Sequence, residues 1–295
     1  MDSFFTKDKQ FYKTLFSLFI VIALQNLVAY SVNMLDNIML GSYSQSALSG
    51  AATVNQIFFL VNQTALAIGN AFVAIASQYW GKRQTEPIRH YVGVAMSFSL
   101  IVAFVILVLC SMIPERILGL FTTAPEIIEQ GCAYLGLLKW TFVLFMVSNL
   151  LICALRSVET VKISFAISVV SLITNGIINY TLIFGHFGFP QLGVSGAAIG
   201  TVVSRVIEMS INIIGGSRNL YLKNAIKMKK VPFDTTKEML KRGLPLLCNE
   251  ILWSISIALI SQSYSTRGII AVAAINITTT VTNFFMIVCY AMGNS

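Results

Sequence analysis

Long apolar runs alternate with short polar breaks along the whole chain. Each run holds about 20 predominantly apolar residues, the length with which an α-helix crosses a bilayer. The breaks are rich in glycine, proline and charged residues, which end helices. Eight runs meet this description: residues 14–40, 47–78, 90–113, 128–153, 163–185, 193–215, 244–264 and 270–292. The pattern therefore predicts an all-α polytopic membrane protein.

Composition supports this fold class and argues against a soluble enzyme. Hydrophobic residues make up 56% of the chain and charged residues 11%, whereas soluble domains are about 25% charged. The sequence has no GxxxxGK[ST] phosphate loop and no HExxH zinc motif, and His90 and His186 fall at opposite membrane faces, so no catalytic triad is expected. The five cysteines are irregularly spaced and are interpreted as buried thiols. We expect neither enzymatic activity nor a bound cofactor.

The net charge of +8 raises the question of a nucleic-acid partner, and the distribution of the charge answers it. Under the predicted spans, 16 of the 20 Lys and Arg residues fall on one side of the membrane. Basic residues are enriched in cytoplasmic loops, so the N-terminus is predicted to be cytoplasmic, in a multi-pass protein of the plasma (inner) membrane. The positive charge then reflects topology and the lipid bilayer, and we expect no nucleic-acid partner.

The chain carries a weak internal repeat with an offset of 221 residues. Ser42-Tyr43-Ser44 matches Ser263-Tyr264-Ser265, and Asn55 matches Asn276 in the same register. Parallel repeats of six spans are typical of two-lobed transporters, although chance similarity among apolar helices is the alternative. We therefore expect a six-helix N-terminal lobe at 1–217, a basic interlobe loop at 218–242, and the first two helices of an incomplete C-terminal lobe at 243–295, as in a fragment or a truncated reading frame.

Two carboxylates inside predicted spans are candidates for function, because a charge within a bilayer is costly. Asp36 lies in the last third of the first span, and Glu250 lies early in the seventh, after Pro245. A buried carboxyl group can exchange a proton, or hold Na⁺ together with neighbouring oxygens. Asn175 and Asn179, four residues apart in the fifth span, could supply those oxygens. The alternatives are snorkelling to the membrane surface for the carboxylates and interhelical hydrogen bonding for the amides.

Other polar residues in the spans have simpler interpretations. Gly196, Gly200 and Ser204 form a ridge of small residues that favours close helix packing. Arg205 and Glu208, three residues apart, are expected to neutralise each other. Lys139 has no evident partner in the sequence; it either counters Asp36 or shows that the predicted span is misplaced by a turn.

Taken together, several segments resemble the multidrug and toxic compound extrusion transporters over nearly the whole chain. The segments are residues 23–27 (ALQNL), 32–41 (VNMLDNIMLG), 78–81 (QYWG), 154–157 (ALRS), 179–180 (NY) with 184–185 (FG), 192–198 (LGVSGAA), and 243–245 (GLP) with 249–250 (NE) and 252–253 (LW). The resemblance implies twelve helices in two lobes, antiport of Na⁺ or H⁺, and export of small organic compounds, often cationic, by a monomer. It also implies that Asp36, Asn175 and Asn179 form a cation site and that Glu250 is a second-lobe carboxylate.

The chain departs from the family pattern in two respects. Val21 stands where family members commonly have a proline, so the resemblance does not carry a proline-dependent bend to this helix. Four helices of the second lobe, with a further acidic position, are not in the sequence. The residues themselves keep two rivals to antiport open: a flippase for lipid-linked precursors from the same superfamily, which predicts a cationic cavity lining, and an inactive truncated product.

Overall fold

A computed structural model describes residues 9–122, 124–218 and 233–265, with the single positions 278, 282, 285, 286, 289 and 292. Its long helices are α1 (Lys9–Tyr43), α2 (Gln45–Gly81), α3 (Thr85–Met112), α5 (Pro125–Ser157), α6 (Val161–Phe184), α7 (Val194–Arg218) and α8 (Phe233–Ser265). The short elements are α4 (Pro114–Gly119) and the 3₁₀ turn η1 (His186–Gly188). The all-α prediction is confirmed.

Seven of the eight predicted spans correspond to long helices, with differences at their ends. The segment expected to be a loop at 114–125 contains the short helix α4, and Pro114 and Pro125 open α4 and α5. Proline suits this first position because its missing N–H has no helical partner there. The helix α8 begins at Phe233, eleven residues before the predicted span, and runs through Pro245. The eighth span and most of the second copy of the internal repeat lie outside the described residues.

Five helices of the described ranges are long and apolar enough to cross a membrane: Gln45–Gly81, Thr85–Met112, Pro125–Ser157, Ile163–Phe184 and Val194–Gly215. In α1 the strongly apolar part is shorter, Tyr12–Val28. Large apolar side chains cover the outside of the bundle, among them Phe104 at 64% and Ile177 at 61% exposed. Such a surface suits lipid, since lipid-facing helices need no polar exterior.

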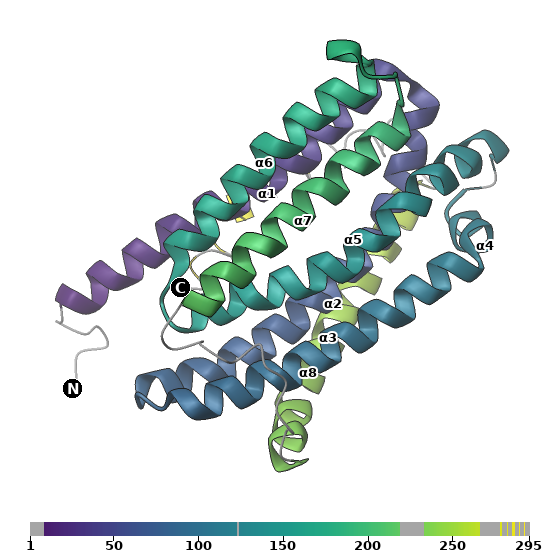
Figure 1. Ribbon diagram of the computed structural model, residues 1–295. Helices are drawn as coiled ribbons and strands as arrows, with labels where there is room; N and C mark the ends of the chain where they lie inside the picture. The colour runs from purple at the N-terminus through teal and green to yellow at the C-terminus, as the bar shows by residue number, and fades with distance from the viewer. Residues whose placement is uncertain are drawn as a thin grey trace.

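Helix α5 lies at the centre of the bundle (Figure 1). It packs against α2 and α3 on one side and α7 on the other, while α1 packs on α6 and α8 packs on α2. Small residues permit the close approach of α2 and α5: a Cβ on Gly50 would lie 2.8 Å from Cβ of Gln130, and one on Gly69 would lie 2.7 Å from Sγ of Cys153. Close contact of this kind drives helix association where lipid replaces water.

The ends of the helices alternate between the two ends of the bundle. We call the end at which α1, α3 and α6 begin the basic end, at the lower left of Figure 1, because Lys9, Lys13, Lys82, Arg83 and Arg89 lie there. At this end the first turns of α8 dock on α2 and α3. Met239 is 4% exposed in the core that they share, and the Tyr91 hydroxyl hydrogen-bonds the Glu238 carboxylate.

Helices α6 and α7 form an antiparallel hairpin whose connection lies opposite the basic end. Gly185, at φ 73°, ends α6 in the left-handed conformation that glycine adopts without strain. Beyond it, the predicted ridge of small residues brings the two helices together: a Cβ on Gly196 would lie 2.7 Å from the Leu182 carbonyl. The packing role predicted for this ridge is confirmed, and it fixes the register of the polar side chains described next.

Candidate functional site

Asp36 lies where α1 packs against α6, and the protein buries it. Asp36 is only 8% exposed. The amide Nδ2 of Asn179 in α6 donates a hydrogen bond of 2.5 Å to Asp36 Oδ1. A carboxylate removed from water needs such donors, because burial without them is costly. Asp36 is therefore held inside the bundle, and the snorkelling alternative is ruled out for this residue.

The two asparagines of α6 continue from Asp36 into the bundle. Asn179 also donates to Oδ1 of Asn175 at 3.2 Å, and Asn175 Nδ2 donates to Thr201 Oγ1 of α7 at 3.5 Å. Both asparagines have 0% exposure. We call Asp36, Asn175, Asn179 and Thr201 the Asp36 group. It links three helices through side chains alone.

One polar atom of the Asp36 group has no hydrogen-bond partner. Oδ1 of Asn179 is fully buried and unpartnered, while the other end of the same amide donates twice. Gly200 lies against this oxygen, since a Cβ there would be 2.1 Å from it. A buried oxygen without a donor is an available ligand for a cation or an acceptor for a proton donor.

Two residues of the site were missed by sequence reasoning. Thr201 accepts from Asn175, and Tyr134 of α5, 3% exposed, makes a side-chain hydrogen bond with Thr201. Thr201 could have been found from its spacing, because Thr201, Ser204 and Glu208 recur on one face of the helix. Tyr134 carried no such signal, since its partner lies 67 residues away in the chain.

The basic residue near Asp36 is Arg205, which interacts with it electrostatically. Arg205 makes the expected ion pair with Glu208, with Nη1 2.7 Å from Oε2, and its guanidinium lies 5.1 Å from the centre of the Phe145 ring. The cationic side chain that acts on Asp36 is thus Arg205, and not Lys139 as suggested from the sequence. Lys139 instead lies near Cys110 of α3.

Glu250 belongs to a separate interface. Gln63 Nε2 of α2 donates to Glu250 Oε2 at 3.1 Å, and one turn further along the same interface the rings of Phe59 and Trp253 lie 6.4 Å apart. The structure thus brings together three of the four predicted site residues and places the fourth between α2 and α8. Among the described residues, no three His, Cys, Asp or Glu side chains cluster as a metal site would require.

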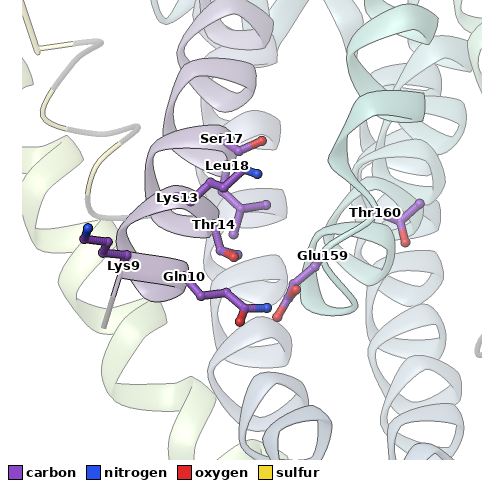
Figure 2. A pocket seen from close by; sticks show the side chains of 8 residues that line it. All are labelled: Lys9, Gln10, Lys13, Thr14, Ser17, Leu18, Glu159 and Thr160. Carbon is purple, nitrogen blue, oxygen red and sulfur yellow. The ribbon is translucent and has the colours of Figure 1, made fainter. Parts of the chain in front are cut away.

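A cavity of about 720 Å³ opens at the basic end between α1 and the turn from α5 to α6 (Figure 2). It is lined by Lys9, Gln10, Lys13, Thr14, Ser17, Leu18, Glu159 and Thr160. Leu18 precedes Asp36 by 18 residues of continuous helix, a rise of about 27 Å. The two lysines also make the cavity a poor receptor for cations, so it is distinct from the Asp36 group.

The comparisons with known proteins agree with this architecture. The MatE family model matches residues 22–181, more than half of the chain. The chain belongs to the MatE family. The match covers Asp36, Asn175 and Asn179, and membership together with the long apolar helices makes the chain a multi-pass membrane protein.

Two relatives of the chain carry the name probable multidrug resistance protein. The chain is 24% identical over 237 residues to the probable multidrug resistance protein NorM of Listeria monocytogenes, covering 79% of this chain and 52% of that protein. It is 26% identical over 291 residues to the probable multidrug resistance protein YoeA of Bacillus subtilis, covering 94% and 61%. The chain therefore spans about half the length of the curated relatives it matches.

Solved structures of MATE proteins share the fold. A MATE transporter in a bent conformation superimposes with a TM-score of 0.86 at 18% identity, covering 96% of this chain and 63% of that chain. An outward-facing multidrug resistance MATE transporter gives 0.85 at 18% identity, covering 96% and 62%. The arrangement predicted for the N-terminal lobe and the beginning of a second lobe is confirmed at the level of the fold.

Proposed function

We propose that this protein acts in secondary active efflux, in which Na⁺ or H⁺ entering at the Asp36 group drives small organic compounds, often cationic, out across the plasma membrane. The observation that carries the proposal is the hydrogen bond from Asn179 to Asp36, which places a carboxylate inside the bundle between two helices. The names of the MatE relatives support the substrate class.

The coupling step follows from the cost of charge inside a membrane. An empty Asp36 carboxylate is stabilised by the Asn179 amide, which holds α1 against α6. A proton or Na⁺ removes the net charge, and the amide then gains by turning its unpartnered Oδ1 towards the new donor or cation. The two occupancy states thus favour different α1–α6 contacts, and a ligand shifts a conformational equilibrium only through such a difference.

Both coupling ions suit the donor set. For Na⁺, oxygens come from the Asp36 carboxylate, Asn179 Oδ1 and Thr201 Oγ1, the hard ligands that this cation prefers. For H⁺, the carboxylate alone suffices. In either case Arg205 stays paired with Glu208, so that it does not compete with the incoming ion.

Glu250 is proposed as a second coupling carboxylate, on the first helix of the second lobe. Its hydrogen bond from Gln63 crosses from α8 to α2. A charge change at Glu250 would therefore act on the contact between the lobes, whereas a change at Asp36 acts within the first. The proposed partners are the lipid bilayer and the organic substrate. We propose no nucleic-acid partner, and a monomer as the working unit.

The rival functions have weaker support. A flippase for acidic lipid-linked precursors needs basic side chains facing a central cavity, and among the described residues Arg205 is engaged by Glu208 and Lys139 lies near α3. An inactive truncated product would keep the fold and lose coupling between cation and substrate. The experiment below separates it from an active protein.

The test is the competition that antiport requires between coupling ion and substrate. The 295-residue chain in lipid nanodiscs is titrated with tetraphenylphosphonium at several Na⁺ concentrations and pH values, and the affinity is measured by equilibrium dialysis. We expect affinity to fall as Na⁺ or H⁺ rises, and Asp36→Asn to remove that dependence. An affinity for the wild type that responds to neither ion would contradict the proposal.

A further inference from the structure

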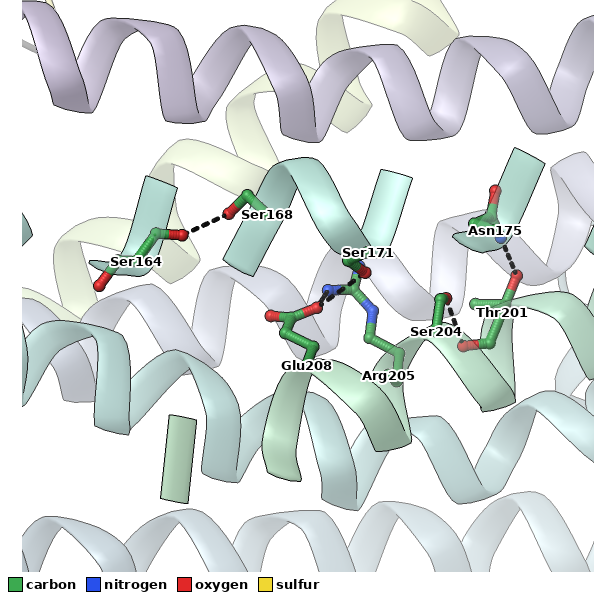
Figure 3. Close-up of polar contacts among 8 residues, drawn as sticks. All are labelled: Ser164, Ser168, Ser171, Asn175, Thr201, Ser204, Arg205 and Glu208. Carbon is green, nitrogen blue, oxygen red and sulfur yellow. Dashed lines mark hydrogen bonds and ion pairs between the residues drawn. The ribbon is translucent and has the colours of Figure 1, made fainter. Parts of the chain in front are cut away.

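A polar seam runs along the buried contact between α6 and α7, from the Asp36 group towards the basic end (Figure 3). On α6 it consists of Asn175, Ser171, Ser168 and Ser164, and on α7 of Thr201, Ser204, Glu208 and Asn212. Spacings of three and four residues place each set on one helix face. Cross-contacts confirm that the faces meet, because Asn175 donates to Thr201 and Ser171 donates to Glu208 Oε2 at 3.4 Å.

The end of the seam nearest the basic end repeats the geometry of the end at the Asp36 group. Ser164 lies eleven residues before Asn175, and Asn212 lies eleven residues after Thr201. Eleven residues make about three helical turns, so in this antiparallel hairpin Ser164 and Asn212 face each other about 16 Å below the hydrogen-bonded pair. Their burial is complete, at 1% and 0% exposure.

Asn175 and Thr201 are hydrogen-bonded to each other, whereas the side chains of Ser164 and Asn212 have no hydrogen-bond partner in the protein. Oγ of Ser164 and both amide atoms of Asn212 are buried without a hydrogen bond. Buried polar groups are nearly always hydrogen-bonded, and internal water satisfies those that lack a protein partner. Asn212 offers two donors and an acceptor there, and the Ser164 hydroxyl offers one donor and further acceptor sites, which is enough to hold water molecules.

Further unpartnered atoms lie on α5. Ser148 Oγ is buried and unpartnered, three residues after Phe145, whose ring lies against Arg205. Because α5 and α7 run in the same direction, Ser148 lies at the level of Glu208, three residues after Arg205. Nε of Arg156, in the last turn of α5, is the next such atom towards the basic end. In the described part of the chain, all such atoms lie on α5, α6 or α7.

We propose that the interface of α5, α6 and α7 holds a file of internal water that connects the Asp36 group with the aqueous phase at the basic end and carries protons. A proton released from the Asp36 carboxyl passes to water, moves along the file, and leaves at the basic end, while Asp36 keeps the negative charge. The Arg205 guanidinium lies between Asp36 and Glu208 along this path, and its ion pair with Glu208 balances its charge.

This proposal rests on the proposed function only for the role of Asp36, and its test requires no transport. Single cysteines replace Ser164 or Ser168 in a chain whose five native cysteines are changed to alanine. The probe is the silver ion, which is small and reacts with thiolates. Control cysteines replace Ile167, an apolar neighbour that is 2% exposed, and Ile173, which is 56% exposed on the lipid face.

With the protein in nanodiscs, the loss of free thiol is followed by maleimide labelling after denaturation. Thiolates form in water and not in a dry core or in lipid, so we expect Ser164→Cys and Ser168→Cys to react about 100-fold faster than either control. Equal rates for seam and control cysteines would overturn the proposal. An intact size-exclusion profile for each variant shows that the comparison concerns folded protein.

A second measurement uses Asn212→Leu and its melting temperature. In a dry seam, leucine removes an unsatisfied amide and raises the melting temperature. In a hydrated seam, it displaces water that serves Ser164 and its neighbours, and the melting temperature falls. Ile213→Leu, at a site that is 37% exposed to lipid, is the matched control. A rise for Asn212→Leu alone would refute the water file whatever becomes of Asp36 and its coupling role.

Discussion

The amide of Asn179 donates both of its hydrogen bonds within 3.2 Å, to Asp36 on α1 and to Asn175 on its own helix. Its oxygen meanwhile lies unpartnered against Gly200. The orientation of this amide therefore depends on the charge of Asp36. A negative carboxylate requires the N–H side, and a neutral or cation-bound one allows the oxygen to take its place.

Replacing Asp36 by asparagine should abolish coupling and leave the fold intact. The new side chain keeps an oxygen for the Asn179 donor but cannot bind a proton or Na⁺ as a carboxylate does. Substrate affinity should lose its dependence on both ions, while the melting temperature changes little. Exposed Glu126→Gln, in the first turn of α5, is the control and should behave as wild type. Coupling that survives in Asp36→Asn would remove this residue from the mechanism.

Replacing Asn179 by leucine should destabilise the protein. The carboxylate of Asp36 then loses its donor in a buried site, which costs about 1–3 kcal/mol in the free energy of unfolding. Chemical denaturation in mixed micelles measures the change. Asn37→Leu, at an exposed position beside Asp36, should alter stability by less than about 0.5 kcal/mol. Similar values for the two variants would show that the Asn179 bond contributes nothing.

Replacing Gly200 by alanine should disrupt the Asp36 group, because the added methyl group collides with the Asn179 side chain. The alanine Cβ would lie 2.1 Å from Asn179 Oδ1, so the amide must move away from Asp36. We expect both lower stability and loss of ion-dependent substrate affinity. Gly136→Ala in α5 meets no atom within 4 Å and should be neutral or stabilising, by up to about 1 kcal/mol from helix propensity. The idea fails if Gly200→Ala retains wild-type ion dependence.

The buried ion pair Arg205–Glu208 should contribute more to the free energy of unfolding than the exposed pair Arg242–Glu238. Arg205→Met leaves Glu208, whose side chain is 7% exposed, as an unpaired charge, and such losses cost about 3–5 kcal/mol. Arg242→Met removes the partner of Glu238 at a site where the two side chains are 45% and 35% exposed, so about 0–1 kcal/mol is expected. Comparable losses in the two variants, measured by denaturation, would mean that Glu208 reaches water without Arg205.

The orientation predicted from the basic residues can be tested with two cysteines. Leu120→Cys lies at the end of α4, at a position 82% exposed, and Lys82→Cys lies in the turn between α2 and α3 at the basic end. An impermeant maleimide applied to intact cells should label Leu120→Cys and should label Lys82→Cys only after permeabilisation. The reverse pattern would place the N-terminus outside.

Hydrophobic length predicted the helices because membrane spans need long apolar runs whatever their partners. It could not predict that α8 begins at Phe233, since the first turns of that helix are polar and are stabilised by docking through Met239. The spacing of Asn175 and Asn179 marked them as possible partners of a carboxylate, and the family resemblance implied that they group with Asp36. Tyr134 and the true neighbour of Lys139 depend on contacts between distant segments, which spacing along one helix does not encode.

The docking of α8 on the first lobe constrains how the molecule can move. Gln63 binds Glu250 near the middle of the contact, Tyr91 binds Glu238 at the basic end, and the backbone of Gly243 lies against Ala71. The proposed function requires the two lobes to move relative to each other. Such a motion either separates α8 from α2 and α3 and breaks these contacts one after another, or leaves α8 attached to the first lobe and moves the two as one body. In the second case the boundary between the moving bodies would not coincide with the boundary between the repeats.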